Sequence, residues 1–256
     1  MESDPFREGS EGAFARTCPR LYELCALTPD PSSYTAYFHR QFTPSLASPR
    51  RMRAWSARER DLQALDGPSW EALKEKLRPH LNGLDRDGRG WQQLLEALNE
   101  ARAYRYLAED VGARDMRFVP ETADQTPDIE AMAANALILC ETKTISESDA
   151  EIYRRVQGAA GYISNRLPDE FLAKVLATIA GAAEQLRGYR SVEHARRMVF
   201  LIVNFDDALG EHAEDFYAQI DARLASEKHD CELVFLNRHT CFTANISMKN
   251  AVIINE

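Results

Sequence analysis

The chain has 256 residues, and a hydrophobic content of 45% is enough to form one substantial core with a smaller appendage. Its 40 acidic and 31 basic residues give a formal net charge of −9. That balance excludes a general nucleic-acid coat protein, because the overall field repels phosphate. It leaves room for a local basic groove and for a metal site that handles phosphate by itself.

Simple patterns exclude several further classes of protein. No apolar run approaches the roughly 20 residues needed to span a bilayer, so we expect no membrane association. Residues 1–16 carry charges throughout and lack the apolar region of a signal peptide. The five cysteines are scattered and contain no CxxC pair, which argues against a disulfide framework and a structural zinc site. We therefore expect a soluble cytoplasmic protein.

The first 90 residues are predicted to form a tail, a helical region and a linker. Residues 1–17 are polar and contain glycine and serine, as is typical of a loose N-terminal tail. Residues 18–82 have the pattern of helices interrupted at prolines, with Ser69 as the N-cap of one of them. Three glycines within residues 82–90 indicate a linker.

Residues 91–256 have the alternating pattern of an α/β domain. Helices are predicted at 91–111, ended by Gly112, and at 148–189 and 211–225. Strands are predicted at 117–119, 128–131, 136–145, 198–203 and 231–236. This order predicts a mixed sheet flanked by helices, preceded by the helical N-terminal region.

Three charged residues are predicted to converge on one face of a strand hairpin. Glu141 and Lys143 lie two residues apart on one strand, so their side chains point to the same face. If 132–135 form the hairpin loop, Asp128 pairs with Leu139, which shares that face. A loop two residues longer or shorter would preserve this parity.

Two carboxylates and a lysine beside an apolar run favour metal-dependent hydrolysis. Carboxylate oxygens are the ligands that Mg²⁺ prefers, and the ion usually completes its shell with waters and phosphate oxygens. A bound metal lowers the pKa of its water and offsets the charge that develops on the phosphate. A nearby lysine can orient or deprotonate that water. The structural alternative is a solvated strand end with a surface ion pair.

The spacing of these residues resembles the signature of the PD-(D/E)XK nuclease superfamily, which here reads Pro127-Asp128, twelve residues, and then Glu141-Thr142-Lys143. The resemblance implies a restriction-endonuclease-like fold, whose central mixed sheet carries these residues on a hairpin after a helix with a further acid. It also implies a Mg²⁺- or Mn²⁺-dependent phosphodiesterase that acts on nucleic acid, and we expect DNA rather than RNA as the substrate. Many nucleases of this kind act as homodimers or with a partner protein.

Carried over residue by residue, the resemblance gives each hairpin position a role. Asp128 and Glu141 would be metal ligands, and the Thr142 carbonyl would be a third candidate ligand. Lys143 would position or activate the attacking water.

The two neighbouring helices supply further candidates. Glu100 on the upstream helix would be an auxiliary ligand or supporting acid, with Glu96 as the second choice and an ordinary surface acid as the alternative. Downstream, the sequence QLRGY at 185–189 resembles the QxxxY element of the RecB-like branch, in which that helix approaches the site. Gln185 and Tyr189 would orient the substrate or the catalytic lysine, and ordinary helix residues are the alternative.

Two other motifs are weaker. Residues 85–96 mimic a calcium-binding EF-hand loop, but Arg89 stands where that loop needs a ligand. The basic run 50–53 with Trp55 could grip a phosphate backbone. Acids close by favour a solvated helix face instead.

The sequence thus predicts a nuclease-like domain over 91–256 that hydrolyses phosphodiester bonds with metal-activated water. The alternative is a catalytically inactive nuclease-like domain that binds nucleic acid or protein. The presence of both acids and the lysine favours the first function. The acidic charge and the lack of a clear basic groove favour the second.

Overall fold

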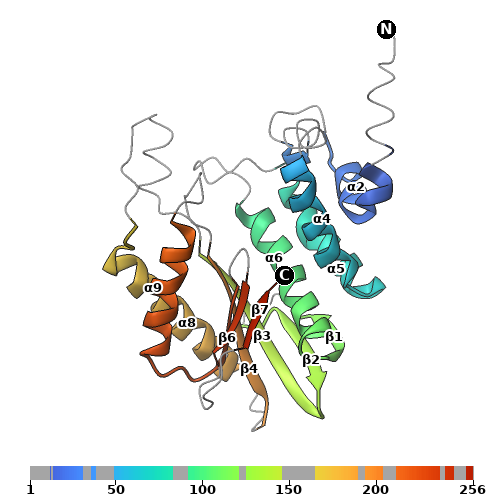
Figure 1. Cartoon of the computed structure of the whole chain (residues 1–256). Coiled ribbons are helices and arrows are strands. Elements are labelled where there is room, and N and C mark those ends of the chain that lie inside the picture. Colours follow the sequence, from blue (N-terminus) through green and yellow to red (C-terminus); the bar gives the residue numbers. More distant parts are fainter. Residues whose placement is uncertain are drawn as a thin grey trace. The chain divides into compact units, whose positions relative to one another are not determined.

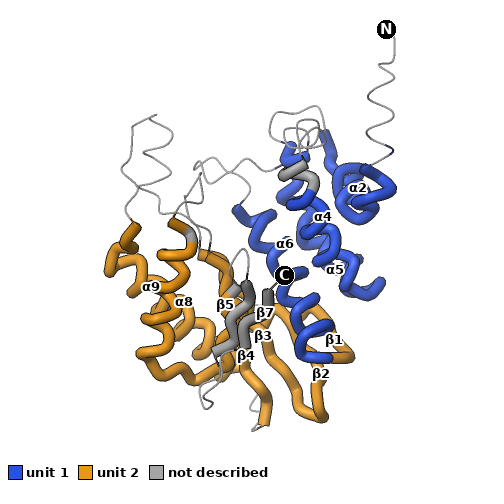
Figure 2. Tube along the Cα trace, viewed as in Figure 1, with its two compact units in different colours: residues 1–112 blue, residues 113–256 orange. Residues whose placement is uncertain are grey.

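The computed structural model describes residues 12, 14–30, 36–38, 49–82, 92–120, 125–145, 165–189, 194–203, 212–236, 240–244 and 252–255. The chain divides into two compact units, unit 1 (1–112) and unit 2 (113–256), which Figure 2 colours separately. The boundary follows the last helix of unit 1, whereas the predicted nuclease-like domain begins at residue 91, in front of that helix. Most of the predicted tail (1–17) and linker (82–90) lies outside the described residues.

Unit 1 is helical throughout its described part. Its elements are α2 (Pro19–Ala26), α4 (Pro49–Gln63), α5 (Gly67–Leu77), the short 3-10 helix η1 (Arg78–His80) and α6 (Gln92–Glu109). Figure 1 labels the α-helices among them. Prolines begin α2 and α4. The N–H groups of the first helical turn have no partner within the helix, so a proline, which lacks an N–H, loses no hydrogen bond there. The prediction of Ser69 as an N-cap is wrong. Asp66 caps α5 instead, and its carboxylate accepts a hydrogen bond from Ser69 N at 2.8 Å.

Unit 2 is built on a mixed sheet. Its strands, in chain order and in sheet order, are β1 (Arg114–Phe118), β2 (Ile129–Ala133), β3 (Ala136–Ile145), β4 (Arg196–Val203), β5 (Glu232–Leu236), β6 (Thr240–Ala244) and β7 (Val252–Asn255). The β3–β4 and β4–β5 pairs are parallel, and the other neighbouring pairs are antiparallel. Helix α8 (Asp169–Gly188) precedes β4, and helix α9 (Ala213–Ala225) precedes β5. The predicted α/β class, with a mixed sheet flanked by helices, is confirmed.

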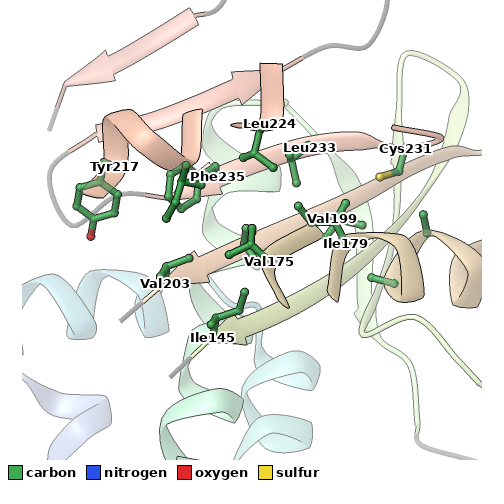
Figure 3. Close-up of a cluster of buried hydrophobic side chains, with 14 of the residues drawn as sticks. Ile145, Val175, Ile179, Val199, Val203, Tyr217, Leu224, Cys231, Leu233 and Phe235 are labelled. Carbon is green, nitrogen blue, oxygen red and sulfur yellow. The ribbon is translucent and has the colours of Figure 1, made fainter. Parts of the chain in front are cut away.

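Helices α8 and α9 pack on one face of this sheet, which we call the α8 face (Figure 3). Both helices link parallel strands, and right-handed crossovers return to the same side of a sheet. The buried cluster beneath them includes Leu139, Ile145, Val175, Ile179, Val199, Val203, Tyr217, Leu224, Leu233 and Phe235. The members from β3 carry odd numbers, so the odd-numbered positions of β3 point to the α8 face. No helix among the described residues is long and apolar enough to cross a membrane.

The hairpin of β2 and β3 sets the register of the charged residues. Its turn is Ala134-Asn135, two residues long rather than the four predicted at 132–135. Both turn residues have positive φ, 48° and 64°, as in the hairpin turns that match the twist of two strands. Shortening the loop by two residues keeps the parity. Asp128 therefore lies opposite Glu141, one position beyond the paired ladder and on the α8 face.

Candidate active site

Backbone hydrogen bonds on two sides hold Asp128 in place. Its Oδ2 accepts a hydrogen bond from Thr142 N at 2.6 Å, which ties the carboxylate to β3. Its carbonyl oxygen accepts a bond from Val119 N at 2.9 Å, which ties the same residue to the end of β1. Pro127 fixes the backbone immediately before it. The carboxylate therefore has a defined position, although Asp128 itself lies outside β2.

Glu141 is buried, and only one of its carboxylate oxygens is paired. Its side chain is 4% exposed, and Lys143 Nζ lies 2.6 Å from Glu141 Oε1. Among the described residues, Oε2 has no hydrogen-bond partner although it is buried. A buried charge is costly unless its oxygens are satisfied, so Oε2 marks a place for a donor or a cation. Lys143 is 32% exposed, which leaves its ammonium within reach of solvent.

The environment of Glu141 makes its carboxyl hard to ionise. Burial raises the pKa of Glu141 from its ordinary value of 4.5 to about 7, and the nearby Asp128 charge adds to the rise. The Lys143 ammonium and the Gln185 amide act in the opposite direction and lower that pKa. The two carboxylates therefore lie close enough to repel each other, and a bound cation would relieve that repulsion.

Helix α8 brings Gln185 and Tyr189 to the hairpin. Gln185 lies in the last turn of the helix, and Tyr189 is the C-cap residue directly after it, with its N–H bonded to the Gln185 carbonyl oxygen at 3.2 Å. Gln185 Nε2 donates a hydrogen bond to the carbonyl oxygen of Thr126 at 2.7 Å. The Tyr189 hydroxyl donates to Glu130 Oε1 at 2.8 Å. The end of α8 is thus attached both to β2 and to the loop that leads into Asp128.

Glu130 is a buried acid at this site, and it is not among the site residues predicted from the sequence. Its side chain is 7% exposed, and its Oε2 accepts hydrogen bonds from Arg117 Nε, at 2.9 Å, and from the Arg117 Nη2. Strand alternation alone would have placed Glu130 on the same face as Asp128, two residues earlier. Its partner was harder to foresee, because the pairing of β1 with β2 shifts between Arg114 and Arg117.

The upstream acids belong to unit 1. Glu100 on α6 is buried, and its carboxylate pairs with Lys76 Nζ at 2.7 Å. Glu96 accepts a hydrogen bond from Gln92 Nε2 at 2.8 Å. The role of Glu100 as an auxiliary ligand or supporting acid for the hairpin carboxylates remains a prediction.

The basic run near Trp55 lacks an available aromatic surface. Trp55 is buried in unit 1 and stacks on Phe38 with ring centroids 5.9 Å apart. Arg53 is exposed, whereas the side chains of 50–52 lie outside the described residues. This arrangement fits a solvated helix face better than a stacking platform. Residues 85–91 of the EF-hand-like segment 85–96 also lie outside the described residues.

The hairpin carboxylates fit one kind of metal ion better than others. Within the described ranges, no three or more His, Cys, Asp or Glu side chains are grouped so that they could hold a metal. That finding argues against a zinc or calcium cage made only of such side chains. Mg²⁺ is usually held by one or two carboxylates together with waters and phosphate oxygens. Asp128 and Glu141, with the unpartnered Oε2, fit that pattern.

A pocket in unit 2 lies apart from these carboxylates. It has a volume of about 200 Å³, and it is lined by residues of α8 and by the segment 227–231 before β5. None of Asp128, Glu141 and Lys143 contributes to its lining. This pocket is therefore separate from the candidate site.

Comparison of this chain with family models, with curated proteins and with solved structures finds no match. The resemblance to the PD-(D/E)XK superfamily accordingly depends on the motif and its spacing. Any proposal about function has to be supported by the residues of the hairpin and of α8.

Proposed function

We propose that unit 2 is a metal-dependent nuclease domain of the PD-(D/E)XK type, with a restriction-endonuclease-like fold. The observation that carries the proposal is the convergence of Asp128, Glu141 and Lys143 at the end of one hairpin. The ion pair with Lys143 engages only Oε1 of Glu141, and Oε2 is buried and has no partner among the described residues. Strongly perturbed carboxylates of this kind gather at functional sites more than elsewhere.

In this proposal the residues of the hairpin site have separate roles. Asp128 and Glu141 would hold Mg²⁺ or Mn²⁺, and the Thr142 amide keeps the Asp128 carboxylate oriented by its 2.6 Å hydrogen bond. The metal, when bound, would lower the pKa of its water and offset charge on the scissile phosphate. Lys143 Nζ, placed 2.6 Å from Glu141 Oε1, would orient the attacking water and stabilise the developing negative charge.

The proposed substrate is nucleic acid, with DNA as the first choice over RNA. The formal charge of −9 disfavours binding through the whole surface. We therefore propose that local contacts hold the substrate, and that a second copy of the chain or a partner protein supplies further basic surface.

A second candidate function is a nuclease-like module that binds nucleic acid or protein without cutting. The acidic net charge favours it, as does the lack of a group of three metal-binding side chains in the described part of the chain. The two functions differ in one measurable respect, because a binding module needs no divalent cation.

A cleavage assay tests the proposed activity. Labelled single-stranded DNA, duplex DNA and RNA are incubated with Mg²⁺, Mn²⁺ or EDTA, with wild type and Asp128→Asn in parallel. We expect metal-dependent cutting by wild type and its loss in Asp128→Asn, because the amide is a weaker metal ligand. Asp169→Asn removes an exposed acid from the first turn of α8 and should cut normally. No cutting by wild type, or equal cutting by Asp128→Asn, would rule out the proposed site and favour the binding module.

A further inference from the structure

We propose that Glu130 and Tyr189 form a positioning pair that fixes the end of α8 on the hairpin and thereby sets the position of the Asp128 carboxylate. The proposal deepens the nuclease site and relies on the proposed function for its metal-binding consequence. Its structural consequence, an effect on the Asp128–Thr142 hydrogen bond, is independent of that function.

The first support is the satisfied burial of Glu130. Its side chain is 7% exposed, and removing a carboxylate from water costs several kcal/mol unless partners replace the water. Both of its oxygens have such partners, since Oε1 accepts from the Tyr189 hydroxyl and Oε2 accepts from the Arg117 guanidinium. Arg117 is 62% exposed, so it neutralises the charge from the solvent side. Glu130 is therefore oriented toward Tyr189.

The second support is the route from Tyr189 to Asp128. Tyr189, the C-cap residue of α8, lies four residues after Gln185, whose Nε2 donates to the Thr126 carbonyl at 2.7 Å. Thr126 precedes Asp128 by two residues, with a rigid proline between them. A shift of the last turn of α8 would therefore pull on the loop that carries Asp128.

The third support is the kind of contact that holds the end of α8. Apolar residues anchor the helix from its middle to its last turn, where Val175, Ile179 and Leu186 belong to the buried cluster. Apolar packing is not directional, so it allows small rotations of a helix end. The directional bonds of Gln185 and Tyr189 define that end, and they converge on the segment around Asp128.

Two variants separate positioning from simple stabilisation. Tyr189→Phe removes only the hydroxyl, and Glu130→Gln removes the charge that faces Arg117. The matched controls are Tyr217→Phe on α9 and Glu232→Gln, whose carboxylate pairs with Arg196 at 2.7 Å on another part of the sheet.

The measurements are the amide ¹H–¹⁵N resonance of Thr142 without metal and the affinity for Mn²⁺ by calorimetry. We expect both test variants to move the Thr142 resonance, because its amide donates to Asp128. We also expect Mn²⁺ binding to weaken by about tenfold, as when a residue that orients a metal ligand is lost. Combining the two changes should add little, since both weaken the contact between Tyr189 and Glu130. The controls should change neither readout.

The outcomes are distinguishable. If Tyr189→Phe lowers the free energy of unfolding but leaves the Thr142 resonance and the Mn²⁺ affinity unchanged, the pair is structural only and the inference is wrong. If wild type binds no Mn²⁺, the proposed metal site fails. In that case the Thr142 resonance alone decides whether the pair positions Asp128.

Discussion

Replacing Lys143 by methionine should slow cleavage by a factor of about 10²–10⁴ at saturating metal, the range in which a positioned proton-transfer group contributes. Lys143 Nζ lies 2.6 Å from Glu141 Oε1, and its side chain is 32% exposed. The Lys143 ammonium therefore contacts the Glu141 carboxylate and would be accessible to the phosphate of a bound substrate. Methionine keeps most of the length of the side chain but removes the charge.

The Lys143→Met experiment needs two further observations. Lys228→Met removes an exposed lysine from the segment before β5 and should leave the rate unchanged. Metal affinity should not fall in Lys143→Met, because losing a cation beside a metal ligand does not weaken metal binding. A variant that cuts as fast as wild type would remove Lys143 from the mechanism. A variant that loses metal binding would assign the lysine to site architecture.

Replacing Glu141 by glutamine should stabilise the metal-free protein at pH 8 by up to about 3 kcal/mol, as the rise in its pKa implies. The folded protein holds the pKa of Glu141 at about 7, above the ordinary 4.5 that applies when the chain is unfolded. At pH values below 4.5 the carboxyl is protonated in both states and has no net effect. As the pH rises from 4.5 to 7, the unfolded state releases its proton first, so stability falls. Above pH 7 the full penalty is present.

Urea unfolding in EDTA at pH 5 and pH 8 measures this effect. At pH 5 the variant should be more stable than wild type by less than about 1 kcal/mol, whereas at pH 8 the difference should reach about 3 kcal/mol. Glu232→Gln serves as the control, because it makes the same change to a carboxylate that Arg196 bonds on both oxygens. An equal difference between wild type and Glu141→Gln at both pH values would contradict a raised pKa of Glu141 in the folded protein. A site that costs stability when empty is expected where function requires the charge.

The hairpin was the most predictable part of the molecule. β3 spans Ala136–Ile145 as predicted, because an apolar run that continues into the β-branched Thr142, Thr144 and Ile145 favours one strand. The face shared by Asp128 and Glu141 followed from parity alone. The predicted loop length was wrong by two residues, yet parity survives such an error.

Other features of the structure were not predicted from the sequence, and each has its own cause. The sequence predicts Ser69 as the N-cap of α5, whereas Asp66, three residues earlier, caps the helix and accepts a hydrogen bond from Ser69 N. Serine and aspartate are both preferred N-cap residues, so residue type alone does not distinguish them. The pairing of Glu130 with Arg117 depends on an irregular strand pair in which Asp115 has a φ of 51°. The burial of Trp55 depends on packing against other segments of unit 1. None of these features leaves a periodic signal in the sequence.

The central claim is that Asp128 and Glu141 form a divalent-cation site, and thermal unfolding under a Mn²⁺ titration tests it most directly. A ligand that binds only the folded state stabilises it by about 2.7 kcal/mol at a hundred times its Kd. We predict a saturable rise in the Tm of wild type and little or no rise in Asp128→Asn and Glu141→Gln. A wild-type Tm that does not respond to Mn²⁺, or one that rises equally in all three proteins, would contradict the claim.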